Sequence, residues 1–133
     1  MKNSKGEHDY DCPDLAVECA LKNMEQGFTA LKFDPAGPYS AYSGHQISLK
    51  TLARSEDFCR KIRAAVGNNC DLLFGTHGQM TPASAIRLAQ RLEPYDPLWF
   101  EEPVPPGQAE AMAQVAAKTS IPIATGERLT TKY

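Results

Sequence analysis

Residues 99–103, Trp-Phe-Glu-Glu-Pro, decide the fold class of this chain. They complete an apolar run that begins at Pro97. A second short apolar run, residues 121–124, leads into Thr-Gly-Glu-Arg at residues 125–128. Each run is typical of a buried strand and stops on a carboxylate, which has to be solvated, paired or bound to a metal. Two such acids on successive strands predict one shared site.

Helices and strands alternate along the chain on both sides of this stretch. Pro13, Ser48 and Thr81 mark the starts of three expected helices, the first of them capped by Asp11-Cys12, and the apolar residues around 112–116 mark a fourth. The expected strands are residues 28–33, 70–74, 98–101 and 121–127. This order predicts an α/β fold with parallel strands joined by right-handed crossovers.

The length limits how much of such a fold the chain supplies. A complete eight-stranded barrel of these units needs about 250 residues, and the chain has 133. We therefore predict a half TIM-type (β/α) barrel with four parallel strands and four helices. Residues 1–10 are polar and unpatterned and are expected to be a loose lead-in, with the barrel domain over residues 11–133. The long connection of residues 34–46 is of a kind that is often functional.

Composition excludes several classes of protein. The chain is 42% hydrophobic and 23% charged, with a formal net charge of −2, so it lacks the basic surface of a nucleic-acid binder. No apolar run has the length of a membrane span, and the first residues do not resemble a signal peptide. The four cysteines show no zinc-like spacing and are interpreted as reduced thiols. Together these features predict a cytoplasmic protein.

A half barrel leaves its sheet incompletely covered. Four parallel strands have two open edges, and helices on one side would leave the other face of the sheet exposed. We therefore predict that the chain self-associates as a homo-oligomer.

Side chains two residues apart share one face of a strand, which predicts the members of the site. The pairs expected to face the barrel axis are Lys32 and Asp34, Gly75 and His77, Trp99 and Glu101, and Thr125 and Glu127. Their polar groups would then meet at the carboxyl ends of the strands, where barrel enzymes place their chemistry. Trp99 itself is expected to lie in the core.

Four stretches together resemble a known family. They are residues 28–34, 71–78, 99–103 and 123–128, and they resemble the mandelate racemase and muconate lactonizing branch of the enolase superfamily. Within that branch the chain is most similar to acid-sugar dehydratases of the galactonate and mannonate type. The resemblance extends from about residue 11 to residue 130. An acid pair followed by proline and a Gly-Glu-Arg, at the ends of successive strands, form a fairly specific combination.

The resemblance implies a Mg²⁺ ion held by one carboxylate from each of three successive strands, and an enediolate formed by removal of a proton beside the substrate carboxylate. Glu101 and Glu127 match two of the metal ligands. Lys32, Asp34 and His77 fall where acid–base groups are expected, and the implied substrate is a small sugar acid. Glu102 would point away from the site, with Arg128 in a supporting role.

The sequence departs from the family pattern in several places. Gly75 stands where the first acidic ligand is expected, and Asp34 replaces a second, proton-abstracting lysine. A capping domain and the later strands of the barrel have no counterpart in the 133 residues. The carboxylates at 101 and 127 could instead be paired with Lys32, Arg128 or each other. The alternative function is therefore a non-catalytic barrel fragment that oligomerises and retains at most weak metal or anion binding.

Overall fold

The structure is a computed structural model that describes residues 6, 8–9, 11–36 and 45–130. Most of the expected lead-in and most of the long connection, residues 37–44, lie outside the described residues. The main elements run in the order α1 (Pro13–Glu25), β1 (Ala30–Phe33), α2 (Leu49–Val66), β2 (Asp71–Gly75), α3 (Pro82–Leu92), β3 (Trp99–Glu101), α4 (Ala109–Ala116) and β4 (Ile123–Ala124). Short 3₁₀ turns, η1 (Gly67–Asn69) and η2 (Glu93–Tyr95), follow α2 and α3.

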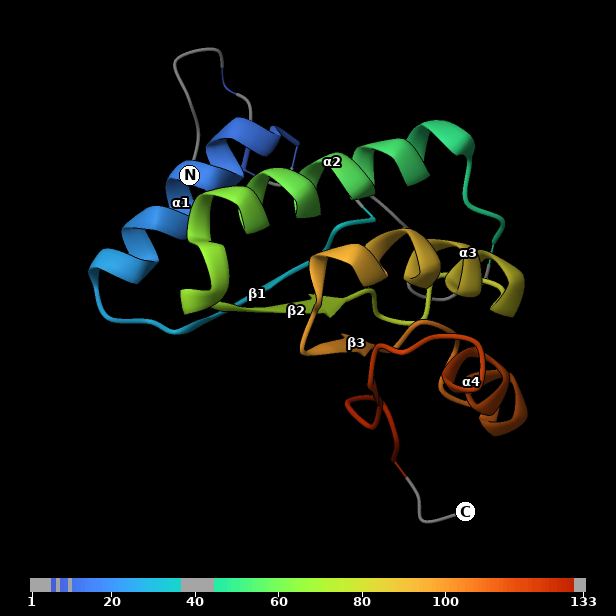
Figure 1. Cartoon of the computed structure of the whole chain (residues 1–133). Helices are drawn as coiled ribbons and strands as arrows, with labels where there is room; N and C mark the ends of the chain where they lie inside the picture. Colours follow the sequence, from blue (N-terminus) through green and yellow to red (C-terminus); the bar gives the residue numbers. More distant parts are fainter. Residues whose placement is uncertain (1–5, 7, 10, 37–44, 131–133) are drawn as a thin grey trace.

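The four strands form one sheet in the order β1-β2-β3-β4, and each pairs in parallel with the next strand in the chain. Figure 1 shows α1, α2 and α3 lying along one face of this sheet, with the strands pointing toward the end where α2 and α3 begin. The prediction of an α/β fold with four parallel strands and four helices is confirmed.

The starts of the helices follow from local chemistry. The Ser48 side chain accepts a hydrogen bond from the Thr51 backbone N–H at 3.1 Å, which caps α2 as predicted. Thr81 caps α3 in the same way, and Pro82 occupies the first turn. The expected start of α1 is confirmed in position, because Cys12 is the N-cap residue, but its side chain makes no capping hydrogen bond. Pro13 and the acidic Asp14 in the first turn favour the start instead.

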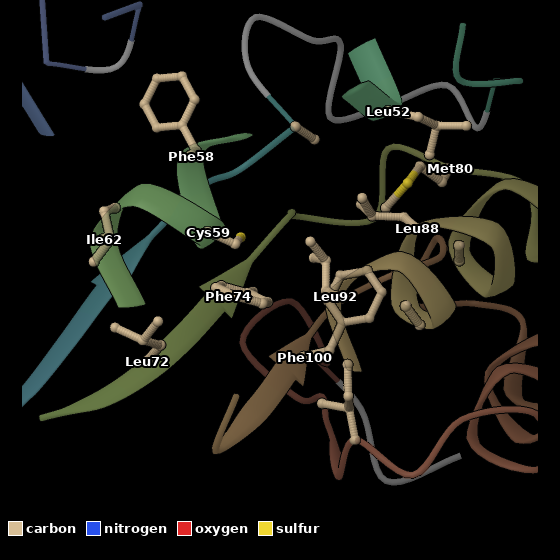
Figure 2. Close-up of a cluster of buried hydrophobic side chains, with 14 of the residues drawn as sticks. Leu52, Phe58, Cys59, Ile62, Leu72, Phe74, Met80, Leu88, Leu92 and Phe100 are labelled. Carbon is tan, nitrogen blue, oxygen red and sulfur yellow. The ribbon is translucent and has the colours of Figure 1, made fainter. Parts of the chain in front are cut away.

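The core lies between the helices and one face of the sheet. Figure 2 shows Leu72, Phe74 and Phe100 of the strands packed beneath side chains of α2 and α3. The predicted apolar face of α2 is confirmed, because its four members are almost fully buried: Leu52, Cys59, Ile62 and Val66. Full burial of a large apolar side chain contributes roughly 1.5–3 kcal/mol, so this layer supplies much of the stability of the fold.

Arg63 closes the amino-terminal end of the sheet. Its guanidinium donates to the carbonyl oxygens of Tyr95 (2.8 Å), Gly67 (2.8 Å), Cys70 (2.8 Å) and Asp96 (3.0 Å). One side chain therefore satisfies carbonyls from two connecting segments, between α2 and β2 and between α3 and β3. The opposite, carboxyl-terminal end of the sheet is left for the polar side chains.

Candidate functional site

The register of the strands fixes which residues share a face. Leu73 of β2 pairs with both Lys32 and Trp99, and Glu101 pairs with both Gly75 and Ala124. These two rows alternate with the core residues of the same strands, so they face away from α1, α2 and α3. The rows place Lys32 and Glu101 on the same face, as predicted. Trp99 belongs to the row of Lys32 and Leu73 and is partly exposed. The expectation that it lies in the core is therefore wrong.

Lys32 and Glu101 form the central ion pair of this face. The Lys32 Nζ lies 2.7 Å from Glu101 Oε1, and the Trp99 Nε1–H donates to Glu101 Oε2 at 3.2 Å. The Lys32 side chain is 47% exposed and that of Glu101 15% exposed. Among the alternatives that the sequence left open, pairing of Glu101 with Lys32 is the arrangement found. Both oxygens of this carboxylate have protein partners.

Gly75 lies beneath this ion pair. A Cβ added to Gly75 would meet the Lys32 Cε at 2.9 Å and the Nζ at 3.7 Å, so the lysine chain crosses β2 where this residue has no side chain. An acid at this position would meet the lysine. The absence of a side chain at residue 75 is therefore what gives Lys32 its path to Glu101.

His77 and Asp34 form a second pair of side chains at the same end of the sheet. The His77 Nδ1 lies 3.6 Å from Asp34 Oδ2, close enough for electrostatic attraction but too long for a hydrogen bond. The other carboxylate oxygen, Oδ1, accepts from the Ala36 backbone N–H at 2.8 Å. His77 has a φ of 55°, a left-handed conformation that is uncommon for residues other than glycine. Such conformations concentrate at functional sites.

Glu102 was assigned no role by the sequence beyond pointing away from the site, yet it organises the neighbouring strand ends. It is fully buried and has a φ of 48°. Its Oε1 accepts from the Thr125 hydroxyl at 3.0 Å and from the Gly126 backbone N–H at 2.6 Å. Glu102 thus ties the end of β3 to the segment after β4. The repeated acid in residues 101–102 was the only sequence signal for it.

The segment after β4 departs from the predicted alternation. Ala124, not Thr125, pairs with Glu101, so the predicted inward pair of Thr125 and Glu127 is displaced by one residue. The strand ends at Ala124, and the φ of 128° at Gly126 then changes the chain direction. Glu127 is exposed. Its role as a metal ligand stays a prediction.

Arg128, the expected supporting residue, lies against the loop that follows β2. Its Nη2 would be only 2.5 Å from a Cβ at Gly78, which has a φ of 74°. Gly78 therefore allows both the turn after His77 and the close approach of the arginine. Arg128 therefore packs against that loop, and its supporting role in the site stays a prediction.

A divalent ion does not fit the side chains as they are arranged. No group of three or more His, Cys, Asp or Glu side chains in the described part of the chain is placed to hold a metal. Glu101 already bonds an ammonium and an indole N–H, and Gly75 offers no ligand. Magnesium prefers about six oxygen ligands in octahedral geometry, of which this arrangement supplies no free set.

A family model described as "Enolase C-terminal domain-like" matches residues 15–133. The chain belongs to this family. This enolase-type chain is 44% identical over 127 residues to a D-galactonate dehydratase from Xanthomonas euvesicatoria, with 92% of the chain and 31% of that protein covered. It is 38% identical over 117 residues to a D-gluconate dehydratase from Thermoproteus tenax, and this match covers 88% of the chain and 23% of that protein.

Solved structures agree with this assignment. One from Burkholderia SAR-1, named provisionally as a mandelate racemase/muconate lactonizing enzyme, superimposes with a TM-score of 0.93 at 76% identity. The match covers 99% of the enolase-type chain and 33% of the Burkholderia chain. A mandelate racemase/muconate lactonizing enzyme from Jannaschia sp. CCS1 gives a TM-score of 0.87 at 57% identity, with 91% and 31% covered.

These matches confirm the predicted family resemblance and the partial (β/α) barrel. The enolase-type chain spans less than a third of the length of the curated relatives described above. Its relatives are sugar-acid dehydratases, and members of the enolase superfamily generally use Mg²⁺. Within the residues that the structure describes, no helix is both long and apolar enough to cross a membrane.

Proposed function

We propose that this chain forms the sugar-acid-binding part of a dehydratase-type barrel, in which His77 is the acid–base group and Asp34 and Lys32 assist it electrostatically. The observation that carries the proposal is the meeting of two pairs, Lys32–Glu101 and Asp34–His77, at the carboxyl ends of β1, β2 and β3. The names of the relatives support the substrate class, since they include D-gluconate, D-xylonate and D-galactonate dehydratases.

Dehydration of a sugar acid needs two proton transfers. A base removes the proton from the carbon beside the carboxylate, and an acid protonates the hydroxyl that leaves the next carbon as water. The enol that results becomes a 2-keto-3-deoxy acid. In our proposal the His77 imidazole removes the proton beside the carboxylate and then protonates the leaving hydroxyl. Asp34 stabilises the charged imidazolium that forms in between. The Lys32 ammonium faces the negative charge that develops on the substrate carboxylate.

Binding of Mg²⁺ would compete with the contacts that Glu101 already makes. By resemblance Glu101 and Glu127 would hold the ion, but Glu101 would first have to release Lys32 and Trp99. We therefore assign no step of the reaction to a metal.

The direct test is a panel of sugar acids that includes D-gluconate, D-xylonate and D-galactonate, with 2-keto-3-deoxy products measured by chromatography. We expect His77→Asn to lower the rate by roughly 10²–10⁴-fold, the usual size of a general acid–base contribution. His45→Asn, in an exposed histidine outside the two pairs, is the matched control and should retain activity. Turnover unchanged in His77→Asn would refute the assignment.

A non-catalytic half barrel that self-associates is the second candidate. The observation that favours it is the sheet face opposite α1, α2 and α3, on which Trp99 is partly exposed. In this proposal a second copy covers that face, in the cytoplasm, where the four free thiols stay reduced. Light scattering after size-exclusion chromatography tests it. A monomer at all concentrations, together with sugar-acid turnover, would rule it out.

A further inference from the structure

Lys32 makes an unusual reach across the sheet. It stands on β1, whereas Glu101 stands on β3, and β2 lies between them. Neighbouring strands are about 4.8 Å apart, so the two backbones are separated by roughly 10 Å. The pair nevertheless closes to 2.7 Å. The lysine therefore extends over β2, and the contact depends on what β2 presents at the crossing point.

The crossing point is Gly75. The Lys32 Cε and Nζ are the heavy atoms within 4 Å of the place where a Cβ of residue 75 would stand. An ammonium group thus occupies the position beside Glu101 that a cation bound by residues 75 and 101 would take. The sequence departure at Gly75 and the path of Lys32 are one structural feature.

We propose that the Lys32 ammonium is the built-in cation of this site, and that the site binds a small hydroxy-carboxylate without a divalent metal. An ammonium has three N–H donors. The described contacts use one of them, on Glu101, and the side chain is 47% exposed, so an incoming carboxylate can reach the others. Trp99 holds the far oxygen of Glu101, which keeps that carboxylate turned toward the lysine.

The hydroxy-carboxylate as ligand rests on the proposed function, whereas the replacement of the metal by Lys32 does not. The two parts therefore fail separately. If no sugar acid binds under any condition, both the proposed ligand class and the proposed function are refuted. If Mg²⁺ binds the wild-type site, the proposal that Lys32 replaces the metal is refuted, whether or not a sugar acid binds.

The experiment is thermal unfolding of the intact chain with increasing Mg²⁺ or Mn²⁺, and separately with D-gluconate in excess EDTA. A ligand that binds the native state raises the melting temperature by mass action. We expect no saturable shift with either metal, and a gluconate shift that EDTA leaves unchanged. We expect Lys32→Met to weaken gluconate binding at least tenfold, with Lys118→Met, in an exposed lysine beyond α4, as the matched control.

Gly75→Asp with Lys32→Met supplies the reverse test, because it adds a carboxylate and removes the ammonium. We expect this double variant to gain a saturable shift with Mg²⁺. Gly75→Ala guards against misfolding, since its methyl group displaces only the flexible end of the lysine. It should keep the wild-type fold by circular dichroism and weaken gluconate binding. A saturable Mg²⁺ shift in the wild type that Glu101→Gln abolishes would overturn the proposal.

Discussion

Replacing Glu102 tests how the strand ends are held together. In Glu102→Ala the Thr125 hydroxyl and the Gly126 N–H lose their shared acceptor. Hydrogen bonds to a charged group contribute roughly 1.5–3 kcal/mol each, which gives up to about 6 kcal/mol for the two. Release of a fully buried carboxylate from its desolvation offsets part of this loss. We expect Glu102→Ala to lower the free energy of unfolding by about 3 kcal/mol.

Glu102→Gln separates hydrogen bonding from charge. Its amide oxygen can keep both bonds, and its NH₂ group would replace Oε2, a buried oxygen that has no hydrogen-bond partner among the described residues. We expect its stability to lie within about 1 kcal/mol of the wild type, because a neutral amide is cheaper to bury than a carboxylate. Thr125→Val removes one bond only and should cost roughly 1.5–3 kcal/mol, the range for a hydrogen bond to a charged group.

The measurement is urea unfolding followed by circular dichroism, at two protein concentrations so that self-association is detected. The reasoning requires a large gap between Glu102→Ala and Glu102→Gln. It is refuted if the alanine variant matches the wild type within about 0.5 kcal/mol, or if the glutamine variant is equally destabilised.

Three further predictions concern the helices and their connections. Hydrogen bonds from the Ser120 N–H and the Thr119 hydroxyl lower the pKa of Glu93 from its ordinary 4.5. A group with a lowered pKa contributes its full stability above the ordinary value and loses it as the pH falls through the folded value. The advantage of the wild type over Glu93→Gln should therefore be full above about pH 4.5 and decrease as the pH falls further, as measured by urea titrations across pH. Burial raises the pKa of Cys59 well above its ordinary value of 9.0, so this thiol should not react in the native protein. Mass spectrometry after iodoacetamide treatment should find it unmodified. Rapid labelling would contradict its buried position. Ser48→Ala removes the cap of α2 and should cost about 1 kcal/mol in thermal unfolding, whereas no loss would mean that the bond to Thr51 contributes nothing.

The layers of the fold could be predicted from local patterns. Ser48 and the spacing of Leu52, Cys59, Ile62 and Val66 define α2 without reference to the rest of the chain, because capping and burial of one helix face act within a few turns. The parallel order of the strands followed from the alternation of helices and strands.

The details of the site could not be predicted in the same way. The alternation in β3 placed Trp99 correctly on the face of Glu101, but how far other elements cover that face is information that a single strand pattern does not contain. The position of Glu127 depended on where β4 ends, which Gly126 and the bonds to Glu102 decide. The path of Lys32 over Gly75 joins three strands. Its prediction would have required both registers, between β1 and β2 and between β2 and β3.

The order of the strands has a consequence for local motion. Pairing extends over most of β1 and β2 but shortens to two residues of β4, Ile123 and Ala124. The amides of Phe100 and Glu102 donate to Pro122 and Ala124 across that short junction. Protection from hydrogen exchange should therefore be highest in β2, which is buried and pairs on both sides, and lowest in β4. The glutamate of the central ion pair stands on β3, between the strongly paired β2 and the weakly paired β4.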